Sequence, residues 1–370
     1  MRFWVSPMPD THRTVLFALL IAVSLVGGAA APASAGHDGG DCTFPVSSTD
    51  ATGTEVTVDA EPGSVVTLDA ASAQTMWELD AEGRVEGMPV RSYTEYLEGS
   101  ESRTDVLSED GRSVDTETVI ELDPDLVLAP NLTSPETIEQ LRDAGLTVYQ
   151  SEFESSFEDI YAKTELYGHF VGECEAADER VAEMQDDVET VRETVADRER
   201  PRVLYYFFGT AAGNGTFIGD IVETAGGENV AATAGVDGYQ QISDETIAEQ
   251  DPEWIVTTDD DASIDTTREP LASTTAVEND QVLEVDANFV SQPAPRVTEP
   301  LLAMAEAFHP EAFAEATAAE TPTTTEASME ETDAATTTAT EEPADGDGAG
   351  FSVVAALVAL LSAALAGRLN

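Results

Sequence analysis

Apolar residues recur at steps of three and four over one long stretch of the chain, from Gly172 to Arg200. Charged residues fill most positions between the apolar or small ones, which are Cys174, Ala177, Val181, Met184, Val188, Val191 and Val195. This spacing predicts one amphipathic helix with a single buried stripe. A helix of about 25 residues is roughly 35 Å long, about the width of a domain, so it can join two domains. The same stripe also suits a homodimeric coiled coil, although the run is barely three heptads long.

Two twelve-residue segments with the same pattern flank this predicted helix. Residues 117–128 and 245–256 each contain a short helix-like stretch that opens on glutamate, then Asp-Pro, then an apolar run. Proline forces the preceding residue out of the helical region, so Pro124 and Pro252 mark helix-to-strand corners. Two copies on either side of a central helix predict paired α/β lobes.

Short apolar runs alternate with amphipathic stretches through both predicted lobes. We expect strands at 55–58, 65–68, 88–90, 126–129, 146–149, 203–208, 254–258 and 282–285, and helices at 71–79, 135–144, 219–225 and 300–308. Turn residues before the first two strands predict that these strands form an opening hairpin. The alternation predicts mostly parallel sheets. The expected fold class is therefore α/β, with two Rossmann-like lobes joined by one long rigid helix.

The N-terminus has the three parts of a secretory signal peptide. Arg2 and Arg13 come first, an apolar run covers 15–26, and Ala-Ser-Ala occupies 33–35. We expect residues 1–35 to be removed on secretion. The remaining boundaries predict an N-terminal lobe at 36–165, the connecting helix at 166–200 and a C-terminal lobe at 201–315.

The C-terminal end is expected to be a linker followed by an anchor. Thr, Glu, Ala and Pro dominate residues 316–349, a composition that does not build a core. Residues 350–370 contain an apolar run at the lower limit for a membrane span, which serves either as a direct anchor or as a sorting signal exchanged for lipid. This tail resembles an archaeal sorting signal beginning Pro-Gly-Phe, with Ala349 in place of the proline. We therefore expect a secreted cell-surface protein that is tethered to the membrane.

The charge of the chain excludes some partners. There are 73 acidic residues against 16 basic ones, Lys163 is the only lysine, and the formal net charge is −57. Such a field repels a phosphate backbone, so no nucleic acid partner is expected. The acidic residues are spread through ordinary hydrophobic patterning, which favours a protein that works in concentrated salt, where screening acts within a few Å. An acidic disordered chain is excluded because 42% of residues are hydrophobic.

Few residues suggest covalent or metal chemistry. Cys42 and Cys174 are the only cysteines, and in an exported chain they predict one disulfide; alternatively, Cys174 is a core residue and Cys42 is free. Nucleotide-binding and hydrolase motifs are absent, and four scattered histidines do not suggest a metal cluster. We expect no enzyme, no metal and no cofactor.

Aromatic and amide residues fall in loops where the two predicted lobes would face each other. Aromatic rings bury a ligand while a few hydrogen bonds orient it, so such loops favour a small-molecule site. For Phe208 and Phe289, ordinary core packing is an equal alternative. The candidate ligand-binding residues are Tyr93, Asn131, Phe208, Tyr239, Asn288, Phe289 and Gln292.

Five motifs together resemble a known family. They are Val65-Val66-Thr67-Leu68, Leu122-Asp123-Pro124-Asp125-Leu126-Val127, Phe217-Ile218-Gly219-Asp220, Ala225-Gly226-Gly227-Glu228-Asn229 and Ala294-Pro295-Arg296. Over about residues 50–313, the set is similar to class III solute-binding proteins of ABC importers, in the vitamin B12, haem and iron-siderophore group. The resemblance implies a monomer that delivers a solute to a permease and its ATPase.

The resemblance also implies roles for particular residues. Glu117 and Glu245 match the glutamates that pair with permease arginines in this family. Tyr93, Phe208 and Tyr239 match aromatic positions of the vitamin B12 binders. Pro130 and Asn131 stand where those binders have a tryptophan, and Asn288 and Gln292 replace a charged pair. A corrinoid is the favoured solute, because the basic residues near the pocket, Arg91 and Arg296, are few. A ferric siderophore or haem, or a surface interaction role without transport, are the alternatives.

Overall fold

The computed structural model describes residues 42–260, 265–269 and 271–320, which belong to one compact unit. The expected signal peptide and the C-terminal apolar segment lie outside these residues. None of the helices in the described ranges combines the length and apolar character that a membrane span requires.

The N-terminal lobe is built around a five-stranded, all-parallel sheet with the order β5-β4-β3-β6-β7. Alternate residues of β6 face opposite sides: Leu126 and Leu128 join one buried cluster, and Val127 and Ala129 join another. Both faces are therefore covered, as parallel sheets require. The strands are β3 (Val65–Thr67), β4 (Val85–Met88), β5 (Thr104–Asp105), β6 (Leu126–Ala129) and β7 (Val148–Gln150), and the covering helices include α1 (Ala70–Glu78), α2 (Thr116–Leu122) and α3 (Pro135–Asp143).

The opening hairpin pairs different strands from those predicted. It consists of β1 (Val46–Thr49) and β2 (Glu55–Val58), whereas the run that we expected to pair with β2 is β3 of the main sheet. The Asp50 carboxylate accepts hydrogen bonds from the Thr52 and Thr54 backbone N–H groups and so holds the turn. The sequence of β1 has one apolar residue in four, so its strand character was not visible in the hydrophobic pattern.

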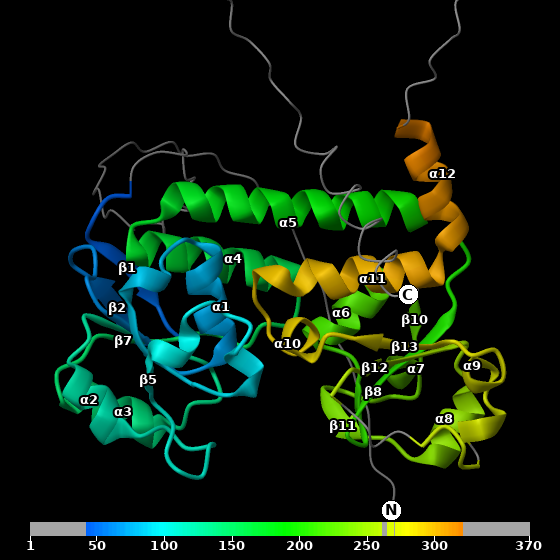
Figure 1. Cartoon of the computed structure of the whole chain (residues 1–370), viewed down its shortest axis with the longest axis horizontal. Helices are drawn as coiled ribbons and strands as arrows, with labels where there is room; N and C mark the ends of the chain where they lie inside the picture. The colour runs from blue at the N-terminus through cyan, green and yellow to red at the C-terminus, as the bar shows by residue number, and fades with distance from the viewer. Residues whose placement is uncertain (1–41, 261–264, 270, 321–370) are drawn as a thin grey trace, which may run out of the picture. The chain divides into compact units, whose positions relative to one another are not determined.

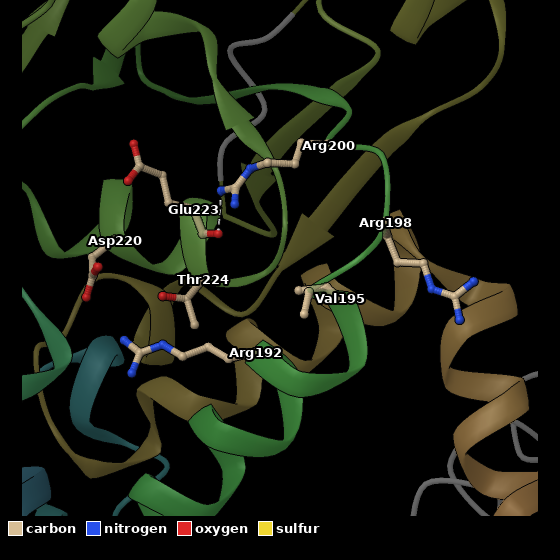
Figure 2. Close-up of a pocket in the computed structure, with 8 residues that line it drawn as sticks. Arg192, Val195, Arg198, Arg200, Asp220, Glu223 and Thr224 are labelled. Atoms are coloured by element: carbon tan, nitrogen blue, oxygen red, sulfur yellow. Dashed lines mark hydrogen bonds between the residues drawn. The ribbon is translucent and has the colours of Figure 1, made fainter.

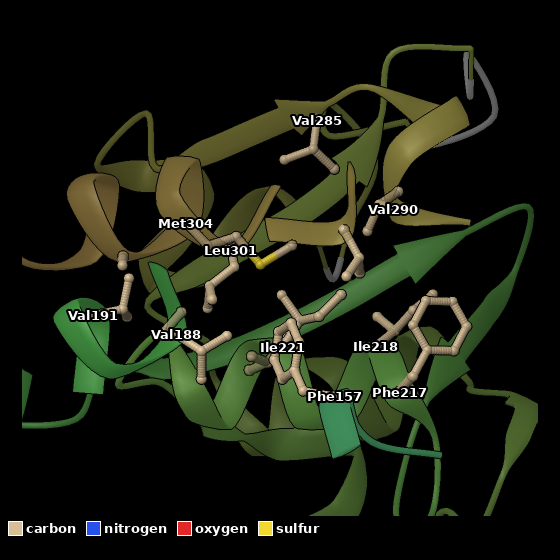
Figure 3. Close-up of a cluster of buried hydrophobic side chains, with 14 of the residues drawn as sticks. Phe157, Val188, Val191, Phe217, Ile218, Ile221, Val285, Val290, Leu301 and Met304 are labelled. Carbon is tan, nitrogen blue, oxygen red and sulfur yellow. The ribbon is translucent and has the colours of Figure 1, made fainter. Parts of the chain in front are cut away.

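The C-terminal lobe has a six-stranded sheet in which part of one edge is antiparallel. The path is β11 (Tyr239–Gln241), β9 (Thr210–Ala212), β8 (Arg202–Phe207), β12 (Trp254–Thr258) and β13 (Val282–Val285), with β10 (Glu228–Asn229) paired to β8. The helices are α6 (Phe217–Thr224), α7 (Val230–Thr233), α8 (Asp244–Gln250), α9 (Thr275–Glu278), α10 (Ala287–Val290) and α11 (Thr298–Phe308). Figure 3 shows how Ile218 and Ile221 of α6 pack toward Leu301 and Met304 of α11 in the core of this lobe.

Two long helices span both lobes. α4 (Phe157–Val171) and α5 (Cys174–Val195) lie side by side, joined at Gly172, which has a φ of 81° (Figure 1). Ala177 of α5 belongs to the N-terminal core and Val188 to the C-terminal core. The predicted connecting helix is thus present as α5, with every residue of the expected stripe buried.

The sequence did not reveal α4 as a second bridging helix. Phe157 packs in the C-terminal core and Phe170 in the N-terminal core, so α4 also crosses between lobes. Gly168 allows the close approach to α5, because a Cβ there would lie 2.3 Å from the Ala177 Cβ. α4 is buried around much of its circumference, so it lacks the single stripe that marks α5.

A last helix extends the C-terminal lobe further than we expected. α12 (Pro310–Glu320) contacts α5 and α11 and continues past residue 316, where the extended linker was predicted to begin. Alanine and glutamate are strong helix formers, so the composition of this stretch is compatible with a helix.

Candidate ligand-binding site

Side chains that follow the parallel strands gather at one edge of each sheet. β3 leads to Asp69 and Ala70, and β12 leads to Asp260. β3 pairs with β4 on one side and with β6 on the other, so the strand order changes direction at β3. The carboxyl end of β3 is therefore a topological switch point. Ligands of open α/β sheets bind outside the carboxyl ends of strands at such points.

A cavity of about 310 Å³ lies at this position and takes its wall from both lobes. The N-terminal lobe contributes Ala70 and Tyr93, and the C-terminal lobe contributes Asp260, Ala287, Asn288, Ser291 and Gln292. The volume is at the lower end of the range for small-molecule pockets. The structure therefore brings three of the predicted ligand residues, Tyr93, Asn288 and Gln292, to one cavity.

Gln292 is committed to the contact between the lobes. Its side-chain Oε1 accepts hydrogen bonds from the Tyr96 hydroxyl at 2.6 Å and from Gln74 Nε2 at 3.2 Å, and its Nε2 donates to the Tyr93 carbonyl at 3.0 Å. Burial raises the pKa of Tyr96 to about 12, so this hydroxyl stays protonated and can donate. Gln292 thus fixes the cavity wall, while its amide is engaged by the protein itself.

Phe289 also belongs to the contact between the lobes and does not line the cavity. Its ring is 8% exposed, lies 3.8 Å from the Arg296 guanidinium carbon and meets the Tyr96 ring edge-on at 5.4 Å. A buried ring in this arrangement gains both apolar burial and a cation–π contact. Of the two alternatives for Phe289, the structure shows packing.

Three further predicted residues lie outside the cavity. Phe208 is 59% exposed after β8, Tyr239 is 36% exposed and packs edge-on against Phe207, and Asn131 follows β6. Burial raises the pKa of the Tyr239 phenol, so it remains neutral. Phe208 directly follows β8 and Asn131 comes two residues after β6, so both lie toward the carboxyl edges of their sheets.

Sequence reasoning missed the exposed apolar residues that follow β6 and β7. Leu132 is 86% exposed and Phe153 is 48% exposed. Large apolar side chains left in solvent near a pocket suggest a binding surface. Their position just after predicted strands was a signal that could have identified them.

The only lysine of the chain lies in the junction between the lobes. Lys163 on α4 forms a salt bridge to Glu154 at 2.9 Å and donates to the Pro293 carbonyl at 2.5 Å. Burial raises the pKa of the nearby Asp69 carboxyl, and the Lys163 charge opposes that shift. Asp69 itself caps α1 by accepting from the Ala71 and Ser72 backbone N–H groups. A single lysine in so acidic a chain was a signal that the sequence analysis did not use.

Glu117 and Glu245 occupy equivalent places in the two lobes. Each is the second residue of its helix, α2 or α8, and each is exposed. The helices are capped alike, with the Asp115 side chain accepting from Thr118 N–H and the Ser243 side chain from Thr246 N–H. α2 and α8 each begin one residue before the glutamate. Both twelve-residue segments then run from helix through an Asp-Pro corner to a strand.

A second hollow of about 330 Å³ lies beside the C-terminal end of α5. Figure 2 shows that its arginines diverge: Arg198 points toward α12, and Arg200 reaches the Glu223 carbonyl. Arg198 pairs with Glu315 at 2.5 Å. This hollow is slightly larger than the cavity between the lobes, but it lies away from the strand ends and its cations are used in structural contacts, so we do not assign the ligand to it.

The cysteines form a disulfide between Cys42 and Cys174, with an S–S distance of 2.03 Å. His169 Nδ1 lies 2.9 Å from Cys174 Sγ. These three residues are the one group among the described residues with the ligand atoms to hold a metal, and both of its sulfur atoms are engaged in the disulfide.

Comparisons with known proteins agree with this architecture. Residues 65–289 match the family described as periplasmic binding protein. The chain is 41% identical over 368 residues to a cobalamin-binding protein of Halobacterium salinarum, covering 96% of this chain and 97% of that protein.

Solved structures show the same fold. The periplasmic vitamin B12 binding protein of Vibrio cholerae superposes with a TM-score of 0.59 at 20% identity, covering 68% of this chain and 98% of that one. An apo periplasmic haem-binding protein from Roseiflexus has a TM-score of 0.61 at 22% identity, covering 67% and 98%. At such identities the likeness establishes two α/β lobes and does not identify a ligand.

Proposed function

Because the chain belongs to the periplasmic binding protein family, we propose that it binds a corrinoid outside the cell membrane and delivers it to an ABC importer. The family is one of binding proteins that work with a permease and an ATPase. The observation that carries the corrinoid assignment is the 41% identity, over nearly the whole of both chains, to a protein named for cobalamin binding.

The cavity wall supports this assignment. The side-chain amide of Asn288 makes no hydrogen bond to another described residue. Ser291 and Tyr93 offer hydroxyl groups. A corrinoid carries amide groups around its ring, and these can exchange hydrogen bonds with such a wall. The exposed apolar residues Phe208, Leu132 and Phe153 give a broad flat solute further surface to bury.

We assign permease contact to Glu117 and Glu245. Both are exposed at the second position of matched helices, and their exposure leaves them accessible to cations of a partner. Charge pairs at an interface fix register and orientation. Substituting each with arginine should abolish uptake in cells while leaving retention of solute by the purified protein intact, and normal uptake by the double variant would contradict the assignment. In the same scheme residues 350–370 tether the protein to the membrane.

The direct test of corrinoid binding is retention of a coloured ligand. The mature protein in molar KCl is mixed with cyanocobalamin, desalted into the same salt, and its visible absorbance is measured. One retained equivalent supports the proposal. No retained cobalamin colour, together with retained ferric siderophore or haemin, would favour the alternative solutes of the same importer family; retention of none would favour a surface role without transport.

A further inference from the structure

Among the described residues, the wall of the cavity between the lobes has one acidic side chain and no basic one. Of the seven described residues that line it, Asp260 is the only one with a charge at neutral pH. Asp259 lies beside it and accepts a hydrogen bond from the Ala287 backbone N–H, and Asp286 accepts from the Asn288 backbone N–H. On the N-terminal side, Asp69 adjoins Ala70, and its buried Oδ1 has no hydrogen-bond partner among the described residues. Asp260 therefore lies on the wall itself, while Asp69, Asp259 and Asp286 each adjoin a wall residue in the sequence.

The cations near this cavity are already neutralised by carboxylates. Arg91, two residues before Tyr93, pairs with Asp105 and donates to the Val90 carbonyl. Arg296 pairs with Glu299 at 2.7 Å while its guanidinium covers the Phe289 ring. Lys163 is held by Glu154. An anionic solute would have to compete with one of these carboxylates for its counter-charge.

In concentrated salt, charges close to the solute determine how charge affects its binding. At about 1 M salt the Debye length is about 3 Å, so the overall charge of −57 is screened and only groups in contact with a solute act on it. Two like charges about 4 Å apart near a protein surface still repel by several kcal/mol before screening. Asp260 is exposed and lies on the wall, so it is the group that a bound anion would meet.

Resting on the proposed function, we propose that Asp260 is a specificity residue that rejects anionic solutes, so that this site takes neutral or cationic amide-bearing compounds. Haem with its propionates and ferric tricatecholates with their negative charge bind this wall more weakly than a neutral solute does. Haem binders share this fold, and the charge of Asp260 separates the solute classes.

The test compares two ligands on matched variants of the mature protein in molar KCl. Association constants for cyanocobalamin and haemin are measured by fluorescence quenching for the wild type, Asp260→Asn, Asp260→Lys and a control, Glu189→Gln. Glu189 is exposed on α5, far along the chain from the cavity wall, and its substitution changes the net charge as Asp260→Asn does. The ratio of haemin to cyanocobalamin association constants should rise about tenfold in Asp260→Asn and further in Asp260→Lys, and stay unchanged in Glu189→Gln.

Two outcomes would overturn the inference. One is a ratio that is the same in all four proteins, including the case in which haemin binds none of them. The other is wild-type protein that binds haemin as tightly as cyanocobalamin. Failure of the proposed function would look different: cyanocobalamin would not bind the wild type, whereas the rise in haemin binding on substitution of Asp260 would still report the charge of the wall.

Discussion

The two lobes share the same arrangement of backbone elements but place different side chains at the cavity. Each has a helix, an Asp-Pro corner and a buried strand, and Asp123 and Asp251 share a left-handed backbone with φ of 48° and 43°. Among the described residues at the cavity, however, the C-terminal lobe supplies Asp260, Asn288, Ser291 and Gln292, while the N-terminal lobe supplies Ala70 and Tyr93.

The shared strands determine where the site lies, and the loops that differ between the lobes determine which solute it accepts. Parallel strands fix where a solute can sit, because their carboxyl ends meet at one edge. The loops after those strands decide which solute is accepted, because their residues do not support the sheets. The N-terminal lobe instead carries the disulfide, whereas the Lys163 salt bridge lies in the junction between the lobes.

Removing the disulfide should have the largest effect and should act on one lobe. Cys42 and Cys174 are 132 residues apart, and cross-linking a loop of this size stabilises a fold by about 5 kcal/mol in the chain-entropy account. Cys42→Ser with Cys174→Ser should lower the free energy of unfolding by that order in molar KCl. Limited proteolysis should then cut the N-terminal lobe first, and equal cutting of both lobes would contradict this asymmetry.

Breaking the salt bridge between Lys163 and Glu154 should come next. Both side chains are largely buried, so Lys163→Met leaves an unpaired carboxylate and should cost about 3 kcal/mol in thermal or denaturant unfolding. Arg192→Met is the matched control, because its pair with Glu158 is long and exposed and should be worth under about 1 kcal/mol. Equal losses in the two variants would show that burial of Lys163 does not matter.

Truncating the aromatic wall should weaken ligand binding by a moderate amount. Tyr93→Ala removes a ring that lines the cavity from the N-terminal lobe, so cyanocobalamin affinity should fall about tenfold. Trp254→Ala is unsuitable as a control because that ring packs in a core, whereas Ile120→Ala, exposed on α2, should leave affinity unchanged. A Tyr93→Ala protein that binds like the wild type would remove Tyr93 from the site.

The smallest effects should distinguish the two Asp-Pro corners. The Asp251 side chain accepts hydrogen bonds from the Thr275 N–H and hydroxyl, whereas the Asp123 side chain has no such bonds among the described residues. Glycine relieves left-handed strain, so Asp123→Gly should raise the free energy of unfolding by up to about 1 kcal/mol. Asp251→Gly should lower it by about 1 kcal/mol, because the lost hydrogen bonds outweigh the relief. Changes of the same sign in both variants would show that the corners are equivalent.

The elements with strong patterns were predictable. The stripe of α5 has the period of a helix, and β12 and β13 are short, largely apolar runs. The structure has a helix at the first position and strands at the other two. α4 and β1 were missed because the first is buried on most sides and the second is mostly polar. Hydrophobic period reports burial on one face, so it loses elements that are buried all round or hardly at all.

The site was only partly predictable. Tyr93 and Asn288 were selected because aromatic rings bury a ligand and amides orient it, and both line the cavity. Gln292 and Phe289 were selected on the same grounds, but long-range hydrogen bonds and ring contacts tie them into the contact between the lobes. Such contacts join residues about 200 positions apart, as in the bond between Tyr96 and Gln292, so no local pattern reveals them.

Hydrogen exchange with and without cyanocobalamin in molar KCl tests most directly whether the solute binds between the lobes. The account predicts that ligand slows exchange in residues 91–96 of the N-terminal lobe and 286–293 of the C-terminal lobe together. Protection confined to residues 192–200 and 220–224, around the arginine-lined hollow, or no protection in either lobe, would contradict it.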